Sequence, residues 1–424
     1  MRFLLSLVVL LALLVAVGLP LALLGMPVAP LSVVLLAAAL FPLVRKVRLP
    51  SMMEEETVEE RWPRPVALLA RVALLLAVAL FLAKVALAPL WSWDHFAIWG
   101  LKSRQMVVEG RLDLGFLALP GFELSSTYYP IGLPVLWCLL ALGGLPGTAL
   151  FKVVHALLGL ALVAVTRRGV LRLGLSPTVA DALAALLAAS PLLWDTITVG
   201  LADLPLALWV TAGLVLVLES SGDHPGSVWP AGVCLGFLPW IKQEGLPLAL
   251  LALAAAAVMV SSGKGRKPRL AALLLPAGLL IAGALAIGRT LPKAGTAFLD
   301  GDWRGRGLER LSRPGEILTM LGSDLAAPDW LGFWFLFAAC LAFALWRALR
   351  REYRRNRTAL LLAGVVVLQL GLYGAIYFCT YLPVADHILS SFTRITAALV
   401  PLGILAIAAS GREMSNGWRL RAGM

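Results

Sequence analysis

The sequence predicts an all-α polytopic membrane protein with about twelve transmembrane helices and one helix, near residues 132–145, that does not cross the membrane. Three observations support this prediction. Of the 424 residues, 60% are hydrophobic and 14% are charged, whereas soluble domains average about 25% charged residues. Long apolar runs follow one another along the whole chain, and clusters of lysine and arginine lie between them. This composition excludes an ordinary soluble domain.

The apolar runs define the expected helices, because about 20 apolar residues span the roughly 30 Å hydrocarbon core. In chain order they cover residues 3–24, 28–44, 66–90, 132–145, 148–166, 178–193, 203–219, 228–241, 246–260, 270–287, 330–349, 358–378 and 391–409. The first run follows Arg2 like a signal peptide, but a second apolar run follows at once without a small-residue cleavage motif. We therefore expect the first run to be retained as a span.

The basic residues predict the orientation. The chain has 36 Lys+Arg against 24 Asp+Glu, which gives a net charge of +12. The basic residues concentrate around 45–64, 167–172, 264–269, 347–357 and 412–421. The positive-inside rule places these clusters in the cytoplasm, so we expect a multi-pass protein of the inner (plasma) membrane with both termini cytoplasmic. Because orientation explains the basic residues, no nucleic-acid partner is expected.

This orientation requires that one apolar run does not cross the membrane. The run 132–145 is the candidate, because it is short and is bounded by Pro130, Pro134 and Pro146. We expect a re-entrant or interfacial helix there.

The expected topology also divides the chain. Five segments lie on the outer side: 91–131, 194–202, 242–245, 288–329 and 379–390. Three parts follow from it: an N-terminal transmembrane hairpin with a cytoplasmic loop (1–65), a central module that contains the first outer loop (66–287), and an outer loop with the C-terminal helices (288–424).

The first outer loop contains the first candidate residues. Asp94 lies at the mouth of a span among Trp91, Trp93 and Trp99, where a carboxylate is partly desolvated and can serve as a base. If the segment is helical, Lys102 lies two turns further along on the same face. The alternative is an aromatic belt with an interfacial carboxylate.

The next two outer segments add three more charges. Asp203 lies at the outer end of the following span, and an ordinary helix N-cap is its alternative explanation. Lys242 and Glu244 lie between two short apolar runs. Charges at that depth are costly unless they pair or bind something, and a simple pair that caps two spans is the alternative.

The last outer segments add cationic and acidic groups. Arg394 falls about one turn inside the final span, after His387, and either binds an anion or extends to the outer headgroups. Asp300-Gly301-Asp302 matches a short D-x-D pattern that can bind metal, although such aspartates are usually turn residues. We expect no metal site and no cofactor, with a bound divalent cation as the alternative.

The reaction follows from the compartment and from these residue types. The sequence has no Walker loop, dinucleotide fingerprint or zinc-protease motif. Nucleotide-activated donors are absent from the outer compartment, so a transferase there needs a donor that is already in the membrane. A polyprenyl-phosphate sugar is such a donor, and its transfer needs a base and cations for the phosphate. Membrane lipids and a glycan, lipid or protein acceptor are the further partners we expect.

The same motifs, taken in order, resemble the GT-C superfamily, in particular the bacterial relatives of protein O-mannosyltransferases and of lipid A aminoarabinose transferases. They are Trp93-Asp94 to Trp99 to Lys102, Tyr128-Tyr129-Pro130, Asp203-Leu-Pro205, Lys242-Gln-Glu244-Gly245 and His387 to Arg394. The resemblance covers roughly residues 66–409 and implies a GT-C-like fold and a lipid-phosphate-sugar donor. It also implies an acidic catalytic base in the first outer loop and a second acidic residue in the second. His95 follows Asp94 where many relatives have paired acidic residues, which argues against copying a metal site from metal-dependent members.

Within this resemblance, each candidate residue has an expected role. Asp94 is the general base, and Asp203, the second expected catalytic residue, orients the acceptor or aids a cation. The expected substrate-binding residues are Lys102, Tyr128, Tyr129, Lys242, Glu244, His387 and Arg394, with the cations holding the phosphate. Two alternatives stay open: an enzyme like the O-antigen ligases that uses a lipid-diphosphate donor, and a lipid or proton-coupled transporter or flippase.

Overall fold

The computed structural model describes residues 2–23, 36–42, 62–88, 94–110, 112, 114–122, 125–142, 147–191, 193–194, 202–220, 228–261, 265–292 and 301–421. All regular elements in these ranges are helices, as the sequence predicts. The chain forms two compact units, each assembled from separate stretches of sequence. Unit 1 comprises 1–56, 82–165 and 195–295, and unit 2 comprises 57–81, 166–194 and 296–424. Two helices, α3 (Arg64–Leu87) and α6 (Gly147–Arg172), run through both units.

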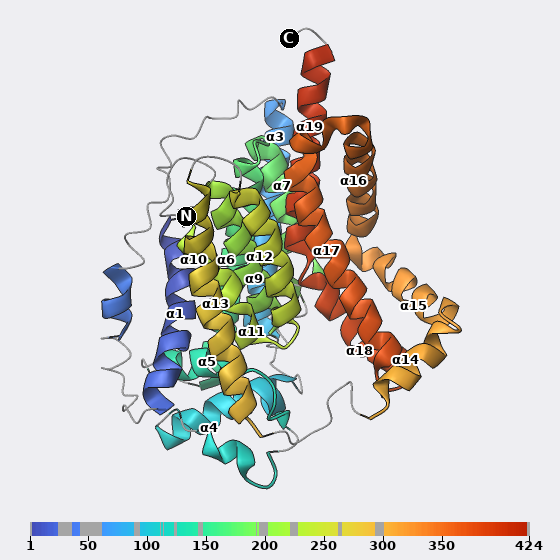
Figure 1. Ribbon diagram of the computed structural model, residues 1–424. Coiled ribbons are helices and arrows are strands. Elements are labelled where there is room, and N and C mark those ends of the chain that lie inside the picture. Colours follow the sequence, from blue (N-terminus) through green and yellow to red (C-terminus); the bar gives the residue numbers. More distant parts are fainter. Residues whose placement is uncertain are drawn as a thin grey trace. The chain divides into compact units, whose positions relative to one another are not determined.

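Unit 1 contains a bundle with shorter helices at one end, where α4 and α5 lie (Figure 1). Its elements are α1 (Arg2–Leu23), η2 (Asp94–Gly100), α4 (Leu101–Glu109), η3 (Gly115–Ala118), α5 (Gly132–Leu142), α9 (Asp203–Glu219), α10 (Trp229–Gly236), α11 (Leu238–Ile241), α12 (Gly245–Val260) and α13 (Arg266–Thr290). The core of unit 1 is α9, in which every residue except Leu218 is buried. A helix that is apolar on all sides is stable only when other helices surround it. Here α1, α10, α11 and α12 pack around it.

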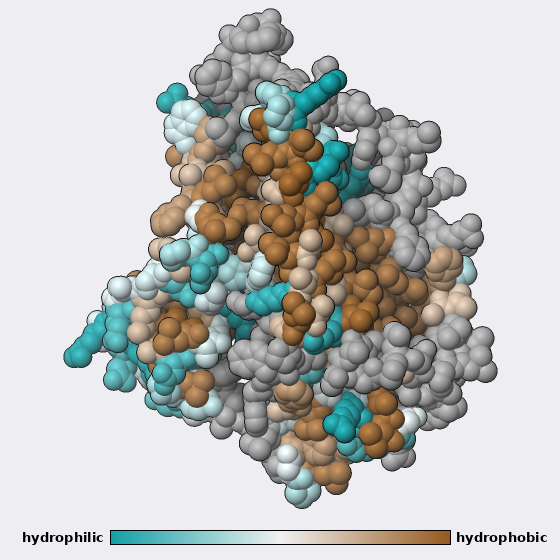
Figure 2. Space-filling view, turned by 180° about the vertical axis from the view of Figure 1, so that it is seen from behind, coloured by the Kyte–Doolittle hydropathy of each residue, from teal (hydrophilic) through white to brown (hydrophobic). Residues whose placement is uncertain are grey.

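The outermost helices expose apolar surface instead. Only 17% of the most apolar stretch of α3 and 11% of that of α13 is buried, and leucines such as Leu69 and Leu279 are largely exposed. Figure 2 shows large hydrophobic side chains gathered on the outside of the molecule. Exposed apolar helices of this length are typical of membrane spans.

Among the described residues, five helical stretches are long and apolar enough to cross a membrane: Arg64–Leu87, Phe151–Arg172, Arg266–Thr290, Phe333–Arg350 and Asn356–Cys379. The pair Val384–Ala397 and Val400–Arg412, bent by 48°, makes a sixth if it counts as one span. The protein is thus a multi-pass membrane protein, and the count of twelve stays a prediction. Several other apolar helices are shorter, among them Gly132–Ala141 and Gly245–Val260.

Unit 2 contains α7 (Pro177–Ala188), α14 (Trp303–Leu311), α15 (Gly315–Leu325), η6 (Pro328–Trp330), α16 (Phe333–Arg347), η7 (Ala348–Glu352), α17 (Tyr353–Cys379), α18 (Val384–Ala397) and α19 (Val400–Arg421). The long helices α16 and α17 pack against α19, and α15 packs against α18. Two arginines of α14 hold the C-terminal end of α17. The Nη1 atom of Arg310 donates to the Thr380 carbonyl at 2.6 Å, and the Nε atom of Arg306 donates to the Cys379 carbonyl at 3.2 Å. Cations stabilise helix C-termini in this way.

The helix boundaries follow several predicted runs closely. The run 203–219 is α9, and 246–260 is α12 with one residue added. The short run 132–145 is the eleven-residue helix α5, whereas the run 28–44 is described only at 36–42, where it is helical. The run 391–409 is not one helix, because α18 ends at Ala397 and α19 begins at Val400. The predicted division of the chain at residues 65 and 287 stays a prediction.

Candidate active site

A buried charge cluster lies where α9, α11 and α12 meet. The Nζ atom of Lys242 is 2.8 Å from Oδ1 of Asp203 and 3.3 Å from Oε1 of Glu244. The side chains of Asp203 and Lys242 are only 1% and 6% exposed, and that of Glu244 is 19% exposed. Among the described residues two carboxylates face this ammonium, so these three side chains together carry a formal charge of −1. Such a group is costly to bury, and it is typical of a functional site in a membrane protein.

The local sequence forces these charges together. After α11 the backbone becomes extended at Lys242 (φ −153°, ψ 155°), and the chain turns back into α12 at Gly245. A Cβ atom on Gly245 would clash with the Leu238 carbonyl, so glycine is required for this close approach. The tight turn keeps Lys242 and Glu244 beside the first residue of α9.

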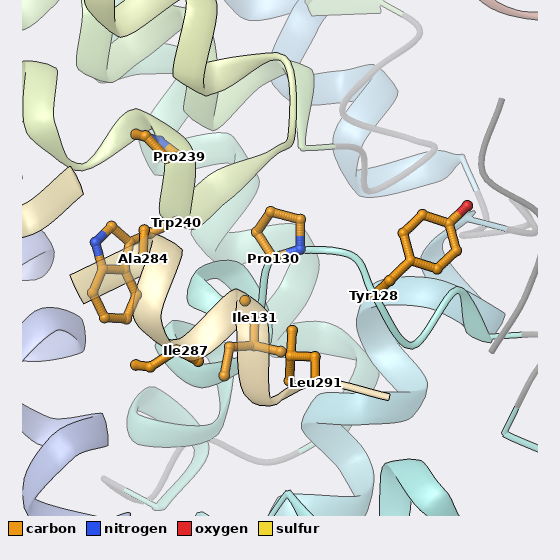
Figure 3. A pocket seen from close by; sticks show the side chains of 9 residues that line it. Tyr128, Pro130, Ile131, Pro239, Trp240, Ala284, Ile287 and Leu291 are labelled. Atoms are coloured by element: carbon orange, nitrogen blue, oxygen red, sulfur yellow. The ribbon is translucent and has the colours of Figure 1, made fainter. Parts of the chain in front are cut away.

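A small pocket of about 40 Å³ lies beside α11, the helix that precedes this turn. Figure 3 shows side chains from three segments around it. They are Tyr128, Pro130 and Ile131 before α5, Pro239 and Trp240 of α11, and Ala284, Ile287, Gly288 and Leu291 at the end of α13. Most of the lining residues are apolar, and Trp240 lies two residues before Lys242 in the chain. The pocket therefore lies between α11 and the end of α13, a helix whose surface is apolar and exposed.

Close packing of α5 on α11 forms one side of this pocket. A Cβ atom on Gly132 would overlap the carbonyl of Trp240, so only glycine allows the two backbones to approach this closely. Because α5 also packs against η2, the same helix contacts both the Asp94 segment and the segment that leads to Lys242. Two segments predicted to share one side of the membrane, 91–131 and the start of 288–329, thus meet beside α11, the helix that precedes Lys242.

Asp94 begins the π-helix η2 and is partly exposed. The next residue, His95, is buried, with its ring centroid 4.9 Å from that of Phe151 and 5.8 Å from that of Trp137. Burial, and secondarily the nearby His155, lower the pKa of His95 to about 4, so its imidazole is neutral at pH 7. Asp94 is therefore the acidic group that this segment presents outward. The predicted neighbours Trp91 and Trp93 lie outside the described residues.

Lys102 lies in α4, two residues after the end of η2. Its side chain is fully buried, and its Nζ atom donates to the Ser126 carbonyl at 2.8 Å. Burial lowers the pKa of Lys102 to about 7. A role of Lys102 in phosphate binding stays a prediction.

The two tyrosines before α5 lie at the same end of unit 1. Tyr128 lines the pocket, and the ring of Tyr129 makes an edge contact with Trp99, with centroids 5.6 Å apart. Trp99 belongs to η2, the helix that Asp94 begins. The predicted site residues of unit 1 are thus connected through α4, α5 and η2, while Asp203, Lys242 and Glu244 are in direct contact.

His387 and Arg394 lie on α18 of unit 2. His387 is buried, its Nδ1 atom is 3.0 Å from Oγ1 of Thr380, and its ring packs on Tyr377. Arg394 is partly buried. One residue earlier, Thr393 donates to Asp324 at 2.5 Å. Burial raises the pKa of Asp324, and this hydrogen bond opposes the rise.

The structure also bears on metal binding. Asp300 lies outside the described residues, and Asp302 accepts from the Gly305 N–H at 2.8 Å as the N-cap of α14. Asp302 therefore has the turn role, which the sequence allowed as the alternative to metal binding. Within the described ranges, no group of three or more His, Cys, Asp or Glu side chains is arranged to hold a metal ion.

Sequence reasoning missed the aromatic wall of the pocket. Trp240 and Pro239 were read only as part of an apolar run, and the last turn of α13 only as a span. The available signal was a tryptophan that directly precedes the polar turn at Lys242, since tryptophan favours the boundary between apolar and polar surroundings.

Comparison with known proteins identifies the chain. Residues 127–372, more than half of the sequence, match the model of glycosyltransferase family 87. No curated protein and no solved structure is significantly similar to the chain. The matched region includes Tyr128, Asp203, Lys242 and Glu244. It confirms the GT-C resemblance and favours an enzyme over a transporter or flippase. The chain therefore belongs to glycosyltransferase family 87, and it is a GT-C-type, multi-pass membrane glycosyltransferase that acts on a sugar donor and an acceptor.

Proposed function

We propose that the protein transfers a sugar from a polyprenyl-phosphate donor to an acceptor hydroxyl on the outer face of the plasma membrane, with both termini in the cytoplasm. One observation supports this most: Lys242, the buried cation of the charge cluster, directly follows α11, whose Pro239 and Trp240 line a pocket at the end of an exposed apolar helix. A lipid-linked sugar has the matching chemistry, namely a prenyl chain, an anionic phosphate and a polyhydroxyl ring.

The pocket suits the prenyl end of such a donor. Ile287 and Leu291 belong to the last turn of α13 and the residue after it, and α13 is the least buried of the candidate spans. A chain that lies in the bilayer reaches this wall without crossing water. Trp240 belongs to this wall and lies two residues before Lys242 in the chain. The donor has the same order of groups, because its prenyl chain is attached to its phosphate.

The charge cluster suits the phosphate and the sugar. Lys242 supplies a buried cation for the charge that develops on the phosphate oxygen as the sugar–phosphate bond breaks. Asp203 and Glu244 hold this ammonium in place and offer carboxylate oxygens to hydroxyl groups of the sugar or acceptor. His387 and Arg394 keep their predicted role in substrate binding as part of the proposal.

Asp94 serves as the general base. It removes the proton from the acceptor hydroxyl, the acceptor oxygen bonds to the anomeric carbon, and the polyprenyl phosphate leaves. The acceptor is a glycan, a lipid or a protein hydroxyl. Asp94 is partly exposed on η2, whereas the neighbouring His95 is enclosed by aromatic rings.

The reaction is tested in proteoliposomes that contain a panel of polyprenyl-phosphate sugars, with products identified by mass spectrometry. Asp94→Asn should lower the transfer rate by about 10²- to 10⁴-fold, the contribution of a general base. Asp329→Asn makes the same change at an exposed aspartate of unit 2 and should leave the rate unchanged. Full turnover by Asp94→Asn would rule out the base assignment. Transfer from lipid-diphosphate donors alone would favour the enzyme class of the O-antigen ligases.

The orientation is tested separately with single cysteines in a background without the native ones. Val108 and Leu349 are 73% and 86% exposed and belong to segments with opposite predicted sides. A membrane-impermeant maleimide added to intact cells should label Val108→Cys, and should label Leu349→Cys only after permeabilisation. The reverse pattern would place the site in the cytoplasm.

A further inference from the structure

Lys102 lies under the turn that carries Tyr128. The Ser126 carbonyl accepts two hydrogen bonds, one from the Lys102 Nζ atom at 2.8 Å and one from the Tyr129 N–H at 2.9 Å. The second bond closes a four-residue turn from Ser126 to Tyr129. The first ties that turn to α4, 24 residues earlier in the chain.

The conformation of this turn needs support from its surroundings. Ser126 has a φ of +49°, in the left-handed region that residues other than glycine rarely adopt. Such a conformation persists where neighbouring groups determine it. Lys102 is 0% exposed, and in the described part of the chain the Ser126 carbonyl is its hydrogen-bond acceptor. The long side chain of Lys102 is thus buried, and its ammonium group donates to this one backbone carbonyl.

Other contacts connect the same turn to the pocket. Thr127 is fully buried and its hydroxyl donates to the Pro292 carbonyl at 2.9 Å, just beyond the end of α13. Tyr128, the next residue, forms part of the pocket wall. The turn is therefore held on one side by α4 and on the other by the chain that leaves α13, with Tyr128 between the two attachments.

We propose that Lys102 is a positioning residue, whose hydrogen bond to Ser126 fixes the 126–129 turn and so holds Tyr128 in the wall of the lipid pocket. This inference rests on the proposed function, because it assigns the pocket to the lipid part of the donor. It gives Lys102 an indirect role in donor binding, in place of direct contact with the phosphate.

The first test compares Lys102→Met with the wild-type protein in proteoliposomes. Methionine keeps most of the side-chain length and removes the donor. The KM for the polyprenyl-phosphate sugar should rise about tenfold while kcat changes less than about twofold, because ground-state donor binding is weakened and the chemical groups are untouched. Arg104→Met, an exposed position on the same helix, should leave both constants unchanged. Where Lys102→Met does not fold, Lys102→Leu, which also lacks a hydrogen-bond donor, is measured in the same way.

A double-mutant cycle with Tyr128→Ala separates positioning from other roles. If Lys102 acts through Tyr128, its substitution should raise the KM of the Tyr128→Ala protein less than about twofold. A full additional rise in KM, or a loss in kcat, would indicate phosphate contact or general destabilisation and would overturn the inference. An unchanged donor KM in a folded Lys102 variant would also overturn it. Absence of transfer from any polyprenyl-phosphate sugar by the wild-type protein would instead refute the proposed function.

Discussion

Two ion-pair clusters among the described residues have similar distances and opposite composition. In unit 1, Lys242 lies 2.8 Å from Asp203 and 3.3 Å from Glu244. In unit 2, the Nε atom of Arg167 lies 2.6 Å from Oδ1 of Asp181, and that of Arg71 lies 3.6 Å from Oδ2. The first cluster has two carboxylates for one cation, and the second has two cations for one carboxylate.

The burial of the cation separates the two clusters further. The Lys242 side chain is 6% exposed, whereas those of Arg167 and Arg71 are 35% and 65% exposed. The second cluster leaves its excess positive charge in contact with solvent or headgroups, as is typical of an anchor that joins helices. The first, counted over the described residues, has its excess negative charge largely inside the protein. Exposure and charge balance, more than distance, therefore distinguish a candidate reaction site from a structural pair.

Lys242→Met should have the largest effect of the substitutions in the two clusters. The transfer rate should fall by at least about 100-fold, because the cation that stabilises the phosphate charge is lost. The free energy of unfolding should also fall by about 3–5 kcal/mol, since the buried Asp203 carboxylate loses the Lys242 ammonium that lies 2.8 Å away. Transfer assays on the folded fraction, with thermal unfolding in the same detergent, measure both effects. A folded variant with normal turnover would make the cluster structural.

Glu244→Gln removes one carboxylate charge from the first cluster, so that one carboxylate and one ammonium remain among the described residues. It tests whether the excess negative charge of the cluster has a function. The amide oxygen can still accept from Lys242, so the free energy of unfolding should change by less than about 1 kcal/mol. We expect transfer to fall about tenfold, because a charged acceptor of hydroxyl hydrogen bonds is replaced by a neutral one. Steady-state kinetics measure the change in the transfer rate, and a melting curve measures the change in stability. Unchanged transfer would show that the excess negative charge has no function.

Asp181→Asn makes the matching change in unit 2. Here the free energy of unfolding should fall by about 1–3 kcal/mol, because a charged hydrogen bond to Arg167 becomes a weaker one. Activity per folded molecule should not change. A loss of turnover larger than the loss of folded protein would contradict the structural role assigned to this cluster.

Arg71→Gln should give the smallest effect. Its guanidinium is mostly exposed and 3.6 Å from the carboxylate, so the free energy of unfolding should change by less than about 1 kcal/mol, and less still at high salt. Melting temperatures at two salt concentrations measure this. A large drop that is independent of salt would mean that Arg71 is a core element of unit 2.

The sequence predicted the parts of the fold that depend on apolar length. The run 203–219 coincides with α9 because its apolar residues are continuous and Asp203 with Pro205 marks its start. Asp203, Lys242 and Glu244 could be singled out for a similar reason, since charges between apolar runs are costly and few. Their mutual contact was not predictable, because it depends on how α9 packs against the turn before α12.

The remaining features depend on signals other than apolar length. The helix breaks at residues 398–399 within the run 391–409, and Pro401 lies in the first turn of α19, where proline is tolerated. The burial of Lys102 was not predictable, because its hydrogen-bond partner lies 24 residues further along the chain. The direction of a buried side chain follows from tertiary contacts, here the Ser126 carbonyl.

The exposed flank of α13 determines how a substrate would be supplied. Its last turn lines the pocket while most of its surface faces outward, so a lipid-linked sugar would arrive by lateral diffusion within the bilayer. The relevant concentration is then two-dimensional, the mole fraction of donor among the lipids. Adding inert lipid or detergent at a fixed total amount of donor would slow such an enzyme, whereas changing the aqueous volume around the vesicles would leave its rate unchanged.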